Sequence, residues 1–132
     1  MDKQQQELMF KLSMFEQQIQ HINQQLQAVE KAITDMTSLN LGLGELQGKE
    51  GEEILAQIGR GIFVKAKLIS EDLTVDVGGK NFVKKTIPET QEIINKQIKK
   101  LEEAKEELSK AMEEINGQLT ETMMEHQKSN KN

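Results

Sequence analysis

The sequence predicts an α+β protein: a long antiparallel two-helix coiled coil with two short β-hairpins inserted between the helices. In two long segments, apolar residues recur at alternating spacings of four and three. Between these segments, residues 53–85 carry short apolar runs that alternate with polar residues and are separated by glycines. Hydrophobic residues make up only 36% of the 132 residues, and there is no Trp or Tyr. That content is low for a globular core but suits a coiled coil, which needs only a narrow apolar stripe.

The first segment is predicted to form one helix over residues 3–41, roughly 60 Å long at about 1.5 Å per residue. Asp2 precedes Gln5 by three residues, a spacing typical of a helix N-cap. The apolar stripe, called the seam below, keeps the alternating four-three spacing at every position over four heptads. Its members are Leu8, Leu12, Phe15, Ile19, Ile22, Leu26, Val29, Ile33 and Met36.

Residues 42–52 are predicted to be a linker, because Gly42, Gly44, Gly48 and Gly51 fall within them. A phosphate-binding loop is the functional alternative for this stretch. It requires Ser or Thr directly after the lysine and a glycine at a fixed distance before it. Glu50 follows Gly48-Lys49, and no glycine stands at that distance. The sequence therefore favours a linker over a nucleotide site.

Residues 53–85 are predicted to form four short strands, paired as two hairpins. Ile62, Val64, Ala66 and Leu68 alternate with Lys65 and Lys67, while Leu73, Val75 and Val77 alternate with Thr74 and Asp76. Gly78-Gly79 suits the positive φ angles of a tight turn. Roughly 35 residues bury too small a core to be stable alone, and hairpins present unpaired edges. We therefore expect this region to associate with other chains.

The second helix is predicted over residues 86–128. Thr86-Ile87-Pro88-Glu89 is typical of a capping box with proline in the first turn. Glu92 with Lys96, and Glu106 with Lys110, are four apart in the order that stabilises a helix. The seam runs through Ile87, Gln91, Ile94, Ile98, Leu101, Lys105, Leu108, Met112, Ile115, Leu119, Thr122 and His126, four of which are polar.

The two helices have similar lengths and can pack antiparallel, so residues 1–132 are expected to form a single domain. This arrangement brings the start of the first helix beside the end of the second. Apolar residues beyond those of the seam gather there: Met9, Phe10, Met14, Met123 and Met124. Exposed apolar surface generally marks an interaction site. The alternatives are that these residues pack against a neighbouring subunit or a crystal neighbour, or that this end is disordered.

Other function classes find little support in the sequence. The net charge of −5 makes nucleic acid an unexpected partner. No acidic or cysteine residue stands at metal-ligand spacing from His21 or His126 in the sequence. The sequence also shows no set of nucleophile, acid and base residues typical of a catalytic site. We therefore expect no enzyme activity, metal or cofactor. The absence of cysteine, of a signal-peptide stretch and of a membrane-spanning run leads us to expect a soluble cytoplasmic protein.

The sequence resembles the α-class subunit of prefoldin. The similarity is carried most specifically by the Ile-Gly-x-Gly-x-Phe-Val-Lys-Ala stretch at residues 58–66, and also by Val75-Asp76-Val77-Gly78-Gly79 between two long helices. In that family the α class has two hairpins and the β class has one. The resemblance implies a hetero-hexamer of two α-type and four β-type subunits, whose hairpins join into β-barrels. It also implies a chaperone that holds non-native polypeptides and delivers them to a group II chaperonin without ATP.

Two sets of site residues follow from the resemblance. The candidate client contacts are Leu8, Met9, Phe10, Leu12, Met14, Met123 and Met124. The candidates for the assembly core are Ile62, Val64, Leu68, Leu73, Val75 and Val77. The rival hypothesis is a structural coiled-coil adaptor, or a filament-forming subunit, that binds one defined partner. An adaptor would bind a single folded partner, whereas a chaperone would bind many unfolded ones.

Overall fold

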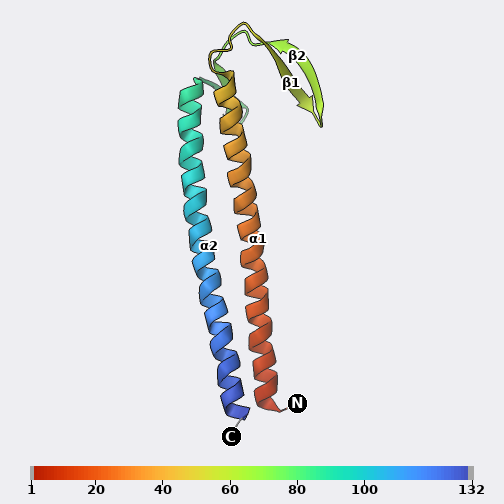
Figure 1. The fold of residues 1–132 in the computed structure, drawn as a ribbon, viewed down its shortest axis with the longest axis vertical. Coiled ribbons are helices and arrows are strands. Elements are labelled where there is room, and N and C mark those ends of the chain that lie inside the picture. The colour runs from red at the N-terminus through yellow and green to blue at the C-terminus, as the bar shows by residue number, and fades with distance from the viewer. Residues whose placement is uncertain (1, 131–132) are drawn as a thin grey trace. The chain divides into compact units, whose positions relative to one another are not determined.

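The computed structural model describes residues 2–130 and confirms the predicted fold class (Figure 1). Two long helices enclose two short antiparallel hairpins in the chain order. The elements are α1 (Lys3–Leu46), β1 (Glu53–Gly59), β2 (Ile62–Lys67), β3 (Leu73–Gly78), β4 (Asn81–Lys85) and α2 (Ile87–Asn130). Neither helix, over the described residues, combines the length and apolarity that a membrane crossing requires.

The chain divides into two units, and α1 and α2 contribute to both. The helical unit combines the described residues up to Ile33 with those from Lys100 onward. The hairpin unit comprises Thr34–Lys99 and therefore contains all four strands.

The helical unit is an antiparallel pair of helices whose predicted seams face each other. Asp2 caps α1, since its Oδ1 accepts a hydrogen bond of 2.8 Å from the Gln5 amide. Along α1 the seam residues are half-buried or buried, and the residues between them are exposed except Ala32, which is half-buried. Ile22 is the most covered of the seam residues, at 8% exposure. This burial pattern confirms the seam that the four-three spacing predicts.

The seam of α2 departs from its prediction at one position in the helical unit. Ala104 is half-buried there, whereas Lys105 is exposed. The Lys105 Nζ atom lies 3.6 Å from Glu30 Oε1 on α1. A long ammonium side chain at the edge of the seam can reach a carboxylate, while a small alanine fits the closer position. The predicted pair Glu106–Lys110 is also present, with 3.6 Å between Nζ and Oε1.

In the hairpin unit, α1 continues past its predicted end. The glycines at 42 and 44 predicted that the helix stops at residue 41, but it extends to Leu46. A glycine inside a helix costs about 1 kcal/mol relative to alanine. Leu43, at 9% exposure, packs in a core with Ile87 and Ile94. Burial of a leucine side chain is worth about 1.5–3 kcal/mol, and Leu46 also packs against this core, so packing outweighs the roughly 2 kcal/mol that the two glycines cost.

Backbone and side-chain hydrogen bonds hold the loop that follows α1. Gly48, with a φ of 77°, ends the helix, and its amide donates to Glu71 Oε1 over 2.7 Å. The Gly51 amide donates to the Leu68 carbonyl over 2.6 Å, and the Leu68 amide donates to the Glu52 carbonyl over 3.0 Å. These bonds tie the loop to the residues after β2.

Each hairpin is antiparallel with one irregularity near its turn. In the first, Ala56 lies opposite Val64 and Gln57 lies opposite Phe63, before a register shift that precedes Gly59. In the second, Val75 lies opposite Val83, and the shift precedes Gly78. Gly78 and Gly79 have φ angles of 102° and 61°, which confirms the positive φ angles predicted for this turn.

A polar layer interrupts the seam of the hairpin unit beside its apolar core. Asn40 stands at a seam position of α1, and its Nδ2 donates to Asn95 Oδ1 on α2 over 2.7 Å. The Gln91 side-chain amide donates to the Asn40 carbonyl over 3.3 Å. The Asn40 Oδ1 atom is buried, and no hydrogen-bond partner is present for it. The layer is therefore only partly satisfied.

The start of α2 has the predicted cap. Thr86 Oγ1 accepts a 3.2 Å hydrogen bond from the Glu89 amide, and Pro88 lies in the first turn. Ile87 is the most deeply buried of these residues, at 2% exposure. The predicted pair Glu92–Lys96 is present at 3.9 Å. The helix covers Ile87–Asn130, compared with the predicted 86–128.

Candidate interaction surfaces

One candidate surface lies at the end of the helical unit where α1 begins and α2 ends; we call it the tip surface. It consists of five apolar side chains that remain exposed over a large part of their surface. Met9, Phe10 and Met14 on α1 are 55%, 67% and 45% exposed, and Met123 and Met124 on α2 are 43% and 56% exposed. The exposure of Phe10, Met14 and Met124 follows directly from the sequence pattern, because these residues lie away from the seam.

The remaining two candidate client contacts have a different environment. Leu8 and Leu12 are half-buried, as expected for members of the seam. Their side chains help to hold the two helices together at this end. The structure therefore separates these two leucines from the five exposed residues that form the tip surface.

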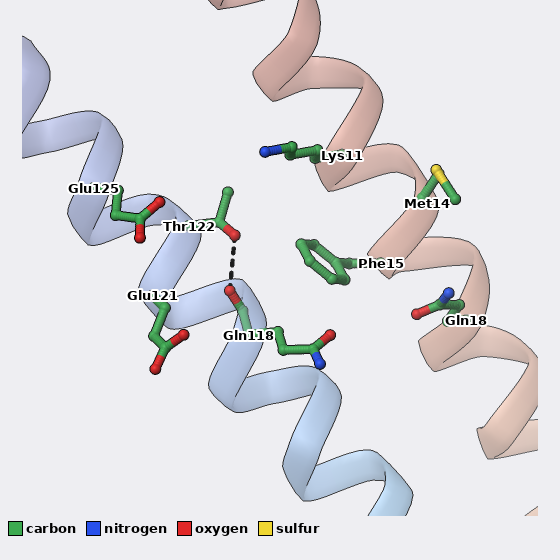
Figure 2. A pocket seen from close by; sticks show the side chains of 8 residues that line it. All are labelled: Lys11, Met14, Phe15, Gln18, Gln118, Glu121, Thr122 and Glu125. Atoms are coloured by element: carbon green, nitrogen blue, oxygen red, sulfur yellow. Dashed lines mark hydrogen bonds between the residues drawn. The ribbon is translucent and has the colours of Figure 1, made fainter.

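A groove between the helices adjoins the tip surface (Figure 2). It has a volume of about 360 Å³ and is lined by Lys11, Met14, Phe15 and Gln18 from α1, and Gln118, Glu121, Thr122 and Glu125 from α2. The Phe15 ring points toward α2 (Figure 2). Thr122 turns its hydroxyl back to its own helix, donating to the Gln118 carbonyl over 2.8 Å. A small residue at this seam position leaves room for the groove.

The second candidate surface lies on the strands of the hairpin unit; we call it the hairpin surface. Of the predicted assembly residues, Ile62, Val64 and Val77 are 60%, 42% and 56% exposed. Leu68, Leu73 and Val75 are half-buried. Leu73 packs against the core that contains Leu43, so part of its surface is already covered within the chain.

The hairpin surface also includes apolar residues that the sequence reasoning missed. Leu55, Ile58, Phe63 and Phe82 are 67%, 69%, 52% and 62% exposed. Leu55 pairs with Lys65, and Phe63 pairs with Gln57, so both lie on the opposite face of the hairpin from Val64. The continuous run Ile62-Phe63-Val64 was a usable signal, because consecutive strand residues point to opposite faces. The first hairpin therefore exposes apolar side chains on both faces.

The described residues contain no group of three or more metal-ligating side chains. His21 is exposed and His126 is half-buried, and they lie on different helices. Both surfaces expose apolar side chains and have charged residues at their edges.

Comparisons with known proteins agree with this architecture. The family model described as Prefoldin subunit matches residues 15–132. Prefoldin subunit alpha from Methanobrevibacter smithii is 31% identical over 99 residues, which cover 74% of this chain and 68% of the relative. Prefoldin subunit alpha from Methanosphaera stadtmanae is 26% identical over 88 residues, which cover 67% of this chain and 64% of the relative.

A solved structure shares the fold. A chain of filamentous PFD from Methanocaldococcus jannaschii, solved by cryo-electron microscopy, superimposes with a TM-score of 0.74 at 20% identity. The match covers 87% of this chain and 97% of that chain. The similarity in sequence to α subunits, and the two hairpins between two long helices, agree with the resemblance noted in residues 58–66. The chain therefore belongs to the prefoldin family, as a chaperone subunit of the archaeal α type.

Proposed function

We propose that this chain is a subunit of an ATP-independent holdase, which captures non-native polypeptides at the tip surface and passes them to a group II chaperonin. The observation that carries the proposal is the gathering of five exposed apolar side chains at one end of the helical unit. The largest apolar patches on soluble proteins are often functional, and such patches mark interaction sites.

The composition of the tip surface suits varied clients. Four of its five residues are methionines, and the fifth is Phe10. Methionine is flexible and polarisable, so one surface can adapt to many apolar segments. Each tip would bind weakly, and several tips on one client would raise the overall affinity through effective concentration. Release would follow from competition with the chaperonin rather than from nucleotide hydrolysis.

The hairpin surface supports the assembly part of the proposal. An isolated two-stranded hairpin is at best marginally stable in water, and both hairpins here stand as separate two-stranded sheets. Pairing with strands of other subunits would cover residues such as Ile62 and Val64 and close the free edges. We propose β-barrels in a cytoplasmic hetero-hexamer of two α-type and four β-type subunits.

The test is to mix the chain with a β-type prefoldin subunit and measure two properties. Native mass spectrometry should give a hexamer of two α-type and four β-type subunits. The same sample, without nucleotide, should suppress the aggregation of two unrelated chemically denatured proteins. If the hexamer forms but the aggregation of neither protein is suppressed, the result would contradict client capture. Binding of one folded protein alone would instead support the structural adaptor.

A further inference from the structure

We infer that the methionines of the tip surface form an oxidation-sensitive site, at which a peroxide converts the thioethers to sulfoxides and thereby weakens client capture. This inference rests on the proposed function, because it concerns the regulation of the same surface. It goes further by assigning to that surface a chemical modification and a way to reverse it.

Methionine is the only sulfur-containing residue of the chain, and most of its copies lie at the tip. The sequence holds seven methionines and no cysteine, so no thiol competes for an oxidant. Met9 and Met14 on α1, with Met123 and Met124 on α2, account for four of the seven. An oxidant that reaches this chain therefore finds most of its sulfur on the tip surface.

The four tip methionines are accessible, whereas two others are more covered. The tip side chains are between 43% and 56% exposed. Figure 2 shows the Met14 side chain turned away from α2. Met36 and Met112 are half-buried, and Met36 packs against the apolar core of the hairpin unit. A peroxide must touch the sulfur in order to react, so we expect the tip methionines to be oxidised before these two.

The reaction is the transfer of one oxygen atom from hydrogen peroxide to the thioether. A lone pair of the sulfur forms the new S–O bond while the O–O bond of the peroxide breaks. The proton of the transferred hydroxyl goes to the departing oxygen, which leaves as water. The sulfur is oxidised by two electrons and the peroxide is reduced by two, so no further reactant is needed.

The sulfoxide changes the tip surface and leaves the pairing of the helices in place. Its oxygen accepts hydrogen bonds from water, and an apolar client segment would have to displace that water. At Met14 this polar group would stand one helical turn from Phe10, the only tip residue without sulfur. The seam residues Leu8 and Leu12 contain no sulfur. Oxidation therefore weakens capture without unfolding the tip.

The experiment treats the full chain, in the oligomer in which it purifies, with hydrogen peroxide that catalase then removes. Peptide mass mapping locates the sulfoxides, and light scattering of a chemically denatured protein measures capture. Oxidation of the four tip methionines should raise the amount of oligomer needed for the same suppression about tenfold. Native mass and the helical circular dichroism signal should not change. The two methionine sulfoxide reductases, one for each epimer, should restore capture.

The test variant changes all four tip methionines to leucine: Met9→Leu, Met14→Leu, Met123→Leu and Met124→Leu. Leucine keeps an apolar side chain of similar volume but has no sulfur to oxidise. The matched control is Met36→Leu with Met112→Leu. Each protein is compared with its own untreated sample, so a difference in starting capture does not affect the result. We expect peroxide to weaken the control as much as wild type and to leave the test variant at its untreated value.

Three results would overturn the inference and leave client capture standing. The first is full capture by wild-type oligomer whose tip methionines are shown to be sulfoxides. The second is an equal loss of capture in the test variant after peroxide. The third is oxidation of Met36 and Met112 before the tip methionines. Failure of the untreated wild-type oligomer to suppress aggregation would instead overturn the proposed function, and the inference with it.

Discussion

Replacing Phe10, Met14 and Met124 together by serine should weaken client capture while leaving the oligomer intact. The three side chains are 67%, 45% and 56% exposed, so this is the fraction that a client can still cover. Complete burial of such a side chain is worth about 1.5–3 kcal/mol, which gives about 2.5–5 kcal/mol for the three exposed fractions. If a client covers half of this area, each tip loses about 1.3–2.5 kcal/mol, roughly a tenfold to seventyfold loss of affinity.

The assay is light scattering of a chemically denatured protein diluted into increasing concentrations of the wild-type or variant oligomer. The variant should need at least tenfold more protein for the same suppression. Its matched control is Leu39→Ser, Leu41→Ser and Ile93→Ser, because these residues are 51%, 68% and 40% exposed on the helices of the hairpin unit. The control should behave as wild type. Full activity in the tip variant, or equal loss in the control, would refute the tip assignment.

Three further predictions concern the stability and assembly of the hairpin unit. Asn40→Leu should raise the free energy of unfolding in urea by about 1 kcal/mol, because it removes the buried oxygen that lacks a hydrogen-bond partner. A variant less stable than wild type would show that all polar groups of this layer are hydrogen-bonded in solution. Ile62→Asp with Val64→Asp should dissociate the oligomer in native mass spectrometry and leave the helical circular dichroism signal unchanged. An oligomer that stays intact would exclude this face from assembly. Gly42→Ala should raise the melting temperature by an amount that corresponds to about 0.5–1 kcal/mol, because an added Cβ meets no atom within 4 Å. Gly78→Ala should lower the melting temperature, because its φ of 102° strains an L-residue. Equal shifts in the two variants would contradict the turn geometry.

The helices could be predicted because their signals are local and repeated. The four-three spacing from Leu8 to Met36 survives as the pattern of burial on α1. The helix end could not be predicted from Gly42 and Gly44, because the deciding contact joins Leu43 to Ile87, which lies 44 positions later in the sequence. Local propensity is a weak prior where such packing is available.

The candidate surfaces were predictable to different degrees. The exposure of Phe10, Met14 and Met124 follows from their angle to the seam, which the helical period fixes. The groove beside them was not predicted, because it depends on how a small Thr122 packs across from α1. On the strands, the assignment of one apolar face overlooked Phe63, which strand alternation alone places on the other face from Val64. It also overlooked Leu55, whose face relative to Val64 depends on the pairing register.

The most direct test of the account is to locate the client on the chain. A photo-crosslinking benzoylphenylalanine is placed at Phe10, at Leu41 or at Phe82, and the oligomer is irradiated with a denatured protein. These three positions are similarly exposed, at 67%, 68% and 62%, so exposure alone favours none of them. The account predicts crosslinks from position 10 and few from the other two. Equal crosslinking at all three positions, or crosslinking only at 41 or 82, would contradict capture at the tip surface.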